Sequence, residues 1–181
     1  MSKLRMNAIS LAIGLAFSVG AVAQSMSKDQ YKSAKDGIAA EYKSASATCA
    51  SLSGNGKDIC KAEAGGKQKV AKARLEADYK PSKDASYKVR VAKADADYSV
   101  AKEKCDDKAG NAKDVCVKEA KAAAVAAKAD AKAQVKTADA RKDAASDKRD
   151  AEYAVAKEKC DALAGDAKSK CMNDAKARFG K

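Results

Sequence analysis

The sequence has no histidine and no tryptophan, and it contains a single proline in 181 residues. Without histidine, the chain cannot form Ser-His or Cys-His nucleophilic pairs or histidine-ligated metal sites. Aromatic residues make up only 4% of the chain, whereas 44 residues are alanine. Beyond position 23, only 23 of the remaining 158 residues are Ile, Leu, Val, Met, Phe or Tyr. This is too little large apolar surface for a broad sheet-based core, and the abundance of Ala, Lys and Asp instead predicts an all-α chain of long helices.

The first 23 residues have the pattern of an export signal. Lys3 and Arg5 precede an uncharged apolar run over residues 8–22, and Ala21-Val22-Ala23 offers small residues at the −3 and −1 positions of a cleavage site. We therefore expect a signal peptide at residues 1–23, a mature protein that begins at Gln24 and is soluble, and a periplasmic location. The alternative is a membrane anchor, but the run is shorter than the roughly 20 residues of a membrane span. Cleavage would lower the net charge from +12 to +10, because two of the 37 basic residues are lost against 25 acidic ones.

Six cysteines fall into three pairs, and ten residues separate the two members of each pair. The pairs are Cys49 and Cys60, Cys105 and Cys116, and Cys160 and Cys171. They recur at steps of 56 and 55 residues, and Tyr42, Tyr98 and Tyr153 each stand seven residues before the first cysteine of a pair. These recurrences predict three copies of one unit, at residues 24–80, 81–136 and 137–181, of which the last is truncated.

Each interval between paired cysteines contains a glycine followed directly by Asn or Asp. The three dipeptides are Gly54-Asn55, Gly110-Asn111 and Gly165-Asp166. Glycine just after a helix allows the left-handed conformation that ends it, and Asn or Asp is a preferred N-cap of a following helix. The interval therefore predicts the turn of a helical hairpin.

The hairpin geometry favours a disulfide within each cysteine pair. Two antiparallel helices in contact bring facing Cα atoms to about 3.4–5.4 Å, which overlaps the range of about 4.4–6.8 Å that a disulfide requires. The alternative is a metal site of four cysteines drawn from two hairpins. Metal-ligating cysteines usually stand two to four residues apart, however, and export favours oxidation.

Apolar and small residues recur at helical spacing between the cysteines. The steps of three and four residues that join Tyr87, Val91, Ala94, Tyr98, Ala101 and Cys105 are those of a seam between coiled-coil-like helices. The helix after Cys116 offers Ala120, Ala123, Ala127, Ala131 and Val135 as the opposing face. Tyrosines on such a seam fill a thin core, although a row of tyrosines for stacking on sugars or bases is an alternative. In the third copy Lys142, Ser146 and Arg149 take the seam positions, which predicts weaker packing there.

The one proline marks the clearest break between helices. Pro81 cannot continue a helix, and Ser82 is a suitable N-cap for the next one. The matching position in the next copy is Lys136-Thr137, where no proline intervenes. The sequence leaves open whether one helix runs from Ala112 to about Ala164 or bends near Thr137.

The repeated pattern C-x4-G-[ND]-x-K-x2-C, with its AKEKC and Y-x-x-A-K segments, resembles a group of small exported Ala/Lys-rich proteins of Gram-negative bacteria that are often labelled TolA-like. The resemblance covers most of the chain after residue 23 and implies a helical protein of the cell envelope. TolA itself carries a membrane anchor and a folded C-terminal domain, neither of which is recognisable here. The resemblance implies no catalytic residue.

The sequence contains no recognisable catalytic, cofactor-binding or metal-binding constellation. We therefore expect a non-enzymatic protein without a cofactor, which acts as an envelope scaffold or a stress-protective factor. The alternative is a basic module that binds anionic envelope polymers, anionic lipid or nucleic acid through counterion release, although no nucleic-acid-reading motif is present. The sequence does not identify a partner. Envelope proteins and anionic envelope polymers are the candidates, and helix seams that face outward also offer self-association.

Overall fold

The computed structural model describes residues 26–181, and these form five helices without any strand. The helices are α1 (Lys28–Ala50), α2 (Gly54–Tyr79), α3 (Lys83–Cys105), α4 (Gly110–Asp161) and α5 (Gly165–Phe179). The predicted all-α fold is thereby confirmed. The predicted signal peptide at residues 1–23 and the mature start at Gln24 lie outside the described residues.

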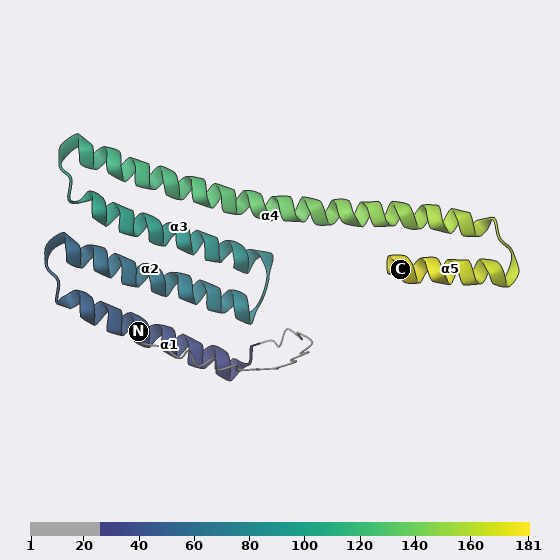
Figure 1. Cartoon of the computed structure of the whole chain (residues 1–181), viewed down its shortest axis with the longest axis horizontal. Helices are drawn as coiled ribbons and strands as arrows, with labels where there is room; N and C mark the ends of the chain where they lie inside the picture. The colour runs from purple at the N-terminus through teal and green to yellow at the C-terminus, as the bar shows by residue number, and fades with distance from the viewer. Residues whose placement is uncertain (1–25) are drawn as a thin grey trace, which may run out of the picture.

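The helices lie side by side in a single layer (Figure 1). Within the described part of the chain, α1 contacts only α2, α2 also contacts α3, α3 also contacts α4, and α5 contacts only α4. The first half of α4 completes a row of four antiparallel helices, whereas its second half extends beyond the row and carries α5 on the same side as α3. Because no second layer covers this row in residues 26–181, both broad faces of the row meet solvent.

Each inner helix of the row packs on two opposite sides. Along α2, Ala64 lies in a groove that residues of α1 line, whereas Gly66 contacts Ala96 of α3. Residues two positions apart point about 200° apart around a helix, so neighbouring small residues can serve the two flanking helices. Among the described residues, only Leu75 and Phe179 are large apolar side chains that are buried, and the other buried residues are Ala, Cys or Gly. Small residues thus allow close approach, and the thin core expected from the composition is confirmed.

Serines begin two of the helices. The Ser27 side chain accepts a hydrogen bond from the backbone N–H of Gln30, whose side chain accepts one from the Ser27 backbone N–H in return. Ser82 accepts from the backbone N–H of Ala85 at the start of α3. Since α2 ends at Tyr79, directly before Lys80 and Pro81, the predicted break at Pro81 is confirmed.

No such break occurs at Lys136-Thr137, because α4 is one helix of 52 residues. Every residue of α4 from 136 to 152 is exposed, and we call this segment the bare span. Lys142, Ser146 and Arg149 all lie in it. The weaker packing predicted for the leading segment of the third copy is therefore confirmed.

The face of α4 that packs on α3 differs in part from the one expected. Ala120, Ala131 and Val135 are at least half-buried, as expected, but Ala123 and Ala127 are exposed. Ala124 is half-buried in their place. The first step along this face after Ala120 is therefore four residues instead of three.

Candidate functional site

A disulfide closes each of the three hairpins near its turn. The bonds join Cys49 to Cys60, Cys105 to Cys116 and Cys160 to Cys171, with Cα–Cα distances of 5.5, 5.7 and 5.6 Å. The predicted local pairing is confirmed, and no cysteine remains free to form the alternative site of four metal-ligating thiolates. The first cysteine of each pair is fully buried, so each bond seals the end of a helix pair.

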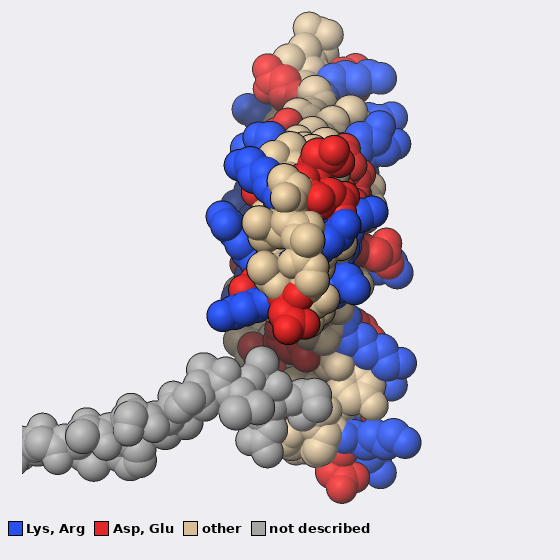
Figure 2. Space-filling model, turned by 90° about the vertical axis from the view of Figure 1, so that its right-hand side faces the viewer, with Lys and Arg blue, Asp and Glu red and all other residues tan. Residues whose placement is uncertain are grey.

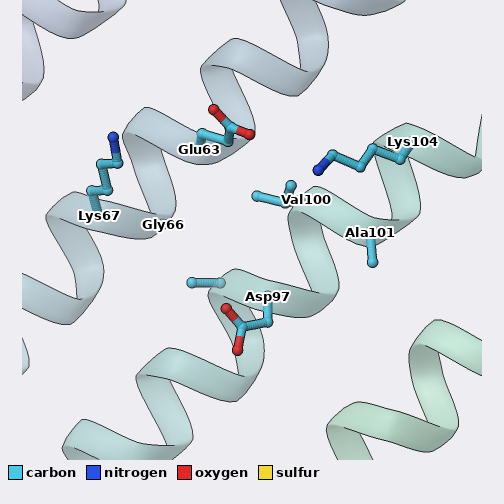
Figure 3. A pocket seen from close by; sticks show the side chains of 8 residues that line it. Glu63, Gly66, Lys67, Asp97, Val100, Ala101 and Lys104 are labelled. Carbon is cyan, nitrogen blue, oxygen red and sulfur yellow. The ribbon is translucent and has the colours of Figure 1, made fainter.

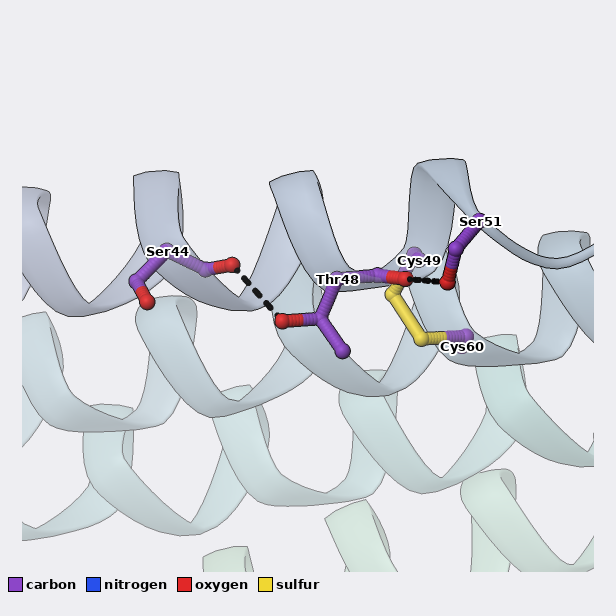
Figure 4. The surroundings of a disulfide bond; sticks show 5 residues. All are labelled: Ser44, Thr48, Cys49, Ser51 and Cys60. Carbon is purple, nitrogen blue, oxygen red and sulfur yellow. Dashed lines mark hydrogen bonds between the residues drawn. A yellow bond between two sulfur atoms is a disulfide. The ribbon is translucent and has the colours of Figure 1, made fainter.

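Hydroxyl groups satisfy backbone carbonyls at the end of α1 (Figure 4). The Thr48 hydroxyl donates to the carbonyl oxygen of Ser44 at 3.2 Å, and the Ser51 hydroxyl donates to the carbonyl oxygen of Thr48 at 2.7 Å. The last carbonyls of a helix have no partner within the helix. Thr48 belongs to this last turn, so the Ser51 bond helps to end α1 beside the disulfide of Cys49. Ser44 lies deeper in the helix, and the bond that the Thr48 hydroxyl makes to it is internal to α1.

The turn glycines take the left-handed conformation, but at a different place from the one predicted. Gly54, Gly110 and Gly165 have φ values of 55°, 54° and 57°. Each begins the second helix of its hairpin instead of ending the first, which stops four or five residues earlier. Asn55 therefore lies inside the first turn of α2 and does not cap it, and its side-chain amide nitrogen is buried without a partner. The predicted capping role of the Asn and Asp residues is wrong.

Ion pairs bridge two of the three turns. Lys113 pairs with Asp106 at 3.0 Å, and Lys168 pairs with Asp161 at 2.9 Å, so each carboxylate directly follows the first cysteine of its hairpin. The hydrogen bond from Lys168, together with its positive charge, lowers the pKa of Asp161 from the ordinary value of 3.8. Both pairs are solvent-exposed, and they favour the turn geometry that the disulfides fix.

The tyrosines lie at helix contacts more than on an open face. Tyr31 of α1 packs on Tyr79 of α2 with 4.5 Å between ring centroids. The Tyr31 hydroxyl donates to Glu76, and this bond raises the pKa of Tyr31 above its usual 10.0. Tyr153 of α4 faces Phe179 of α5 at 6.1 Å. Of the six tyrosines, only Tyr42 is exposed, at 38%, so their positions support core filling and not a row for stacking.

An open groove of about 490 Å³ runs between α2 and α3 (Figure 3). Its floor contains the contact of Gly66 with Ala96, where a Cβ atom at position 66 would lie 2.9 Å from the Ala96 Cβ. Glu63 on α2 and Lys104 on α3 stand on its rim, and Lys104 extends toward the side that carries Glu63. The groove is therefore the seam of a close helix pair with charged edges. Its charged lining residues are of both signs, Glu63 and Asp97 against Lys67 and Lys104.

Basic and acidic side chains are mixed over the surface. Seen along the long axis, the molecule is a narrow column with Lys and Arg on both flanks and Asp and Glu among them (Figure 2). Basic residues exceed acidic ones by only one or two in each of the five helices. The bare span is balanced, since it contains Lys136, Arg141, Lys142, Lys148 and Arg149 against Asp139, Asp143, Asp147, Asp150 and Glu152. The positive charge of the chain is thus distributed and does not form a patch on one helix.

The chain matches no protein-family model, no curated protein and no solved structure. The resemblance to TolA-like exported proteins therefore stays a prediction from the cysteine pattern. In residues 26–181, no helix has an apolar stretch long enough to cross a membrane. The three disulfides indicate an oxidising compartment of the kind that exported proteins reach.

Proposed function

We propose that this chain is a non-enzymatic scaffold of the periplasm, which holds two disulfide-closed parts of the molecule at a fixed separation in the cell envelope. The export pattern at residues 1–23 and the disulfides support the compartment. The proposal rests on one observation: the continuous helix α4 packs in the four-helix row at one end and against α5 at the other.

The length of α4 sets the separation. At about 1.5 Å per residue, its 52 residues span about 78 Å. A flexible linker of the same number of residues would leave the two parts free to approach, whereas a helix fixes their distance and their relative rotation. Continuous helix through Lys136-Thr137 is consistent with a spacer, and a stress-protective role without a defined partner would not require it.

The charge distribution favours a protein-binding scaffold over the polyanion-binding alternative. Counterion release scales with the number of phosphates that a contiguous set of Lys and Arg neutralises. Here the bare span carries equal numbers of basic and acidic residues, and several lysines elsewhere are already paired with carboxylates, as Lys88 is with Asp84 at 2.6 Å. Binding to lipopolysaccharide, anionic lipid or nucleic acid therefore stands as the competing outcome of the test.

Photo-crosslinking in intact cells tests the proposal. A photoreactive residue would replace exposed Ser33 on α1 or exposed Ser169 on α5, at the two parts that α4 separates. A scaffold should give discrete protein adducts at both positions, and these should persist at physiological salt. Recovery of lipopolysaccharide or nucleic acid alone, lost as salt is raised, would support the polyanion alternative and overturn the scaffold.

A further inference from the structure

One edge of α4 is exposed along its length among residues 26–181, and near its C-terminal end it borders an open groove that Arg178 and Phe179 of α5 also line. Residues recur along this edge at steps of three or four, and all of them are exposed. All but two are small and apolar, and the two exceptions are Thr137 and Asp147. The apolar members, which we call the open edge, are Ala122, Ala126, Ala129, Ala133, Ala140, Ala144, Ala151 and Val155. Since Ala129 and Ala133 each stand two residues from buried Ala131, the open edge points away from α3.

The contact between α2 and α3 shows what such an edge packs against. Gly66 stands six residues after Cys60, and Ala122 stands six residues after Cys116. Ala96 stands nine residues before Cys105, and Ala151 stands nine residues before Cys160. Gly66 and Ala96 are in direct contact and buried. The first half of the open edge therefore repeats the α2 side of a packed interface, and the second half repeats the α3 side.

The same correspondence holds along the rest of the seam. Beyond Gly66 and Ala96, the antiparallel seam between α2 and α3 continues through half-buried residues. These are Ala73, Val89, Ala77 and Ala85. Counted from the cysteines, their counterparts in α4 are Ala129, Ala144, Ala133 and Ala140, all exposed. Glu63 and Lys104, on the rim of the groove, likewise correspond to Glu119 and Lys159. Both sides of the α2–α3 interface thus recur on α4, with a Glu near a Lys. Ala122 stands where the template has Gly66, and its Cβ requires the two α4 helices to lie farther apart at this contact than α2 and α3 do.

The two halves of the open edge cannot meet within this conformation of the chain, because both belong to one continuous helix. Pro81 turns α3 back onto α2, but the matching position is Lys136-Thr137, and the helix runs on. A second copy of the chain, with its α4 antiparallel, supplies both missing halves at once. We propose that the protein forms a domain-swapped dimer through its α4 helices, with the two-fold axis beside Lys136-Thr137.

The proposed contact is isologous and places the third hairpin of each chain on the four-helix row of the other. Ala122 of one copy lies against Ala151 of the second copy, and Ala129 lies against Ala144. The row thereby continues from α4 of one molecule into α4 and α5 of the other. Asp147 departs from the pattern, because it faces Ala126 where the template has an apolar residue, and its removal should tighten the dimer.

Oligomeric state tests the dimer. Light scattering or sedimentation of the mature protein should show a dimer, and Ala144→Glu should weaken it at least tenfold by placing a charge in the seam twice. The matched control is Ala145→Glu, which is equally exposed but points about 100° away around the helix, and it should dimerise as the wild type does. Asp147→Ala should strengthen association. A monomeric wild type, or a dimer equally insensitive to both Glu variants, would overturn the proposal.

Disulfide trapping tests the register of the two helices. Chains with Ala122→Cys and chains with Ala151→Cys, mixed under mild oxidation, should form a covalent heterodimer. Replacing Ala122→Cys by Ala127→Cys moves the thiol out of the seam and should abolish the product. Crosslinking that is equally efficient with both partners would contradict the register and with it the swap.

Restoring the proline tests the exchange itself. Lys136→Pro should break α4 where Pro81 separates α2 from α3, so that the third hairpin folds back on its own row. The variant should become monomeric while it keeps most of its helical circular dichroism and all three disulfides. A variant that stays dimeric with those properties intact would show that association does not depend on the unbroken α4, and would overturn the proposal.

Discussion

Removal of the third disulfide by Cys160→Ser together with Cys171→Ser should release α5 from α4 while α1, α2 and α3 stay folded. The bond closes a loop with a sequence separation of 11, for which the chain-entropy treatment gives about 2.8 kcal/mol. The rest of the α5 attachment is of similar size. Burial of Phe179 to 8% exposure is worth about 1.5–3 kcal/mol, and its ring contact with Tyr153 about 0.5–1.5 kcal/mol.

A helix of 15 residues is marginal in water by itself, so these contacts decide whether α5 forms. Loss of about 2.8 kcal/mol should lower the hydrogen-exchange protection of α5 amides by about 100-fold. Amides of α2 and α3 should keep their protection, because α5 contacts only α4 among the described helices.

Hydrogen exchange resolved by residue or by peptide measures this. The control is Cys105→Ser with Cys116→Ser, which should loosen the row at the turn between α3 and α4 and leave α5 protected. A fall in α5 protection of less than about tenfold, or an equal fall throughout the chain, would refute the assignment of α5 as a separately held unit.

Four further perturbations test the packing of α2, the turn before α5 and the disulfides. Gly65→Ala should stabilise α2 by about 1 kcal/mol in chemical denaturation, because alanine is the better helix former and no atom lies within 4 Å of the added Cβ. Gly66→Ala should give less stabilisation or a net loss, because its Cβ would lie 2.9 Å from that of Ala96; equal gains would contradict the close contact. Asp161→Asn should lower stability at neutral pH, and the difference from wild type should vanish as the pH falls through the lowered pKa, below 3.8, where the wild-type carboxyl also loses its charge. Full reduction should diminish both helicity and melting temperature more than in a domain with a large core, and unchanged circular dichroism would contradict the thin core.

The cysteine spacing carried most of what could be predicted about the fold. Local pairing followed from two distances, the separation of packed helices and the reach of a disulfide, and both apply wherever a hairpin turns. Pro81 and Ser82 were likewise sufficient, because a residue without an N–H and a capping hydroxyl act locally. The disulfide pairing and the helix break depend only on residues close to them in the chain, so they can be predicted from the sequence.

The arrangement of the helices was not predictable in the same way. An alanine-rich helix offers similar small residues on most of its sides, so Ala123 and Ala124 could each have faced α3, and the sequence pattern selected the wrong one. The turn glycines were placed in the right conformation, but the end of the first helix was misjudged, because the Ser51 hydroxyl bond and the turn after Cys49 end it several residues earlier. The unbroken passage of α4 through Thr137 depends on the absence of a competing signal, which a sequence shows only weakly.

The single layer has a consequence for how this protein loses structure. Because each helix in residues 26–181 touches only its neighbours, stability is close to a sum of helix terms and nearest-neighbour interface terms, as in a one-dimensional array. Within this part of the chain α1 is held on one side, by the Tyr31–Tyr79 contact and the Cys49–Cys60 bond among others. Opening should therefore begin at α1 and α5 and reach the α2–α3 pair last. We therefore expect stepwise unfolding from the two ends. When a terminal helix unfolds, the side of the next helix that it covered becomes exposed to solvent.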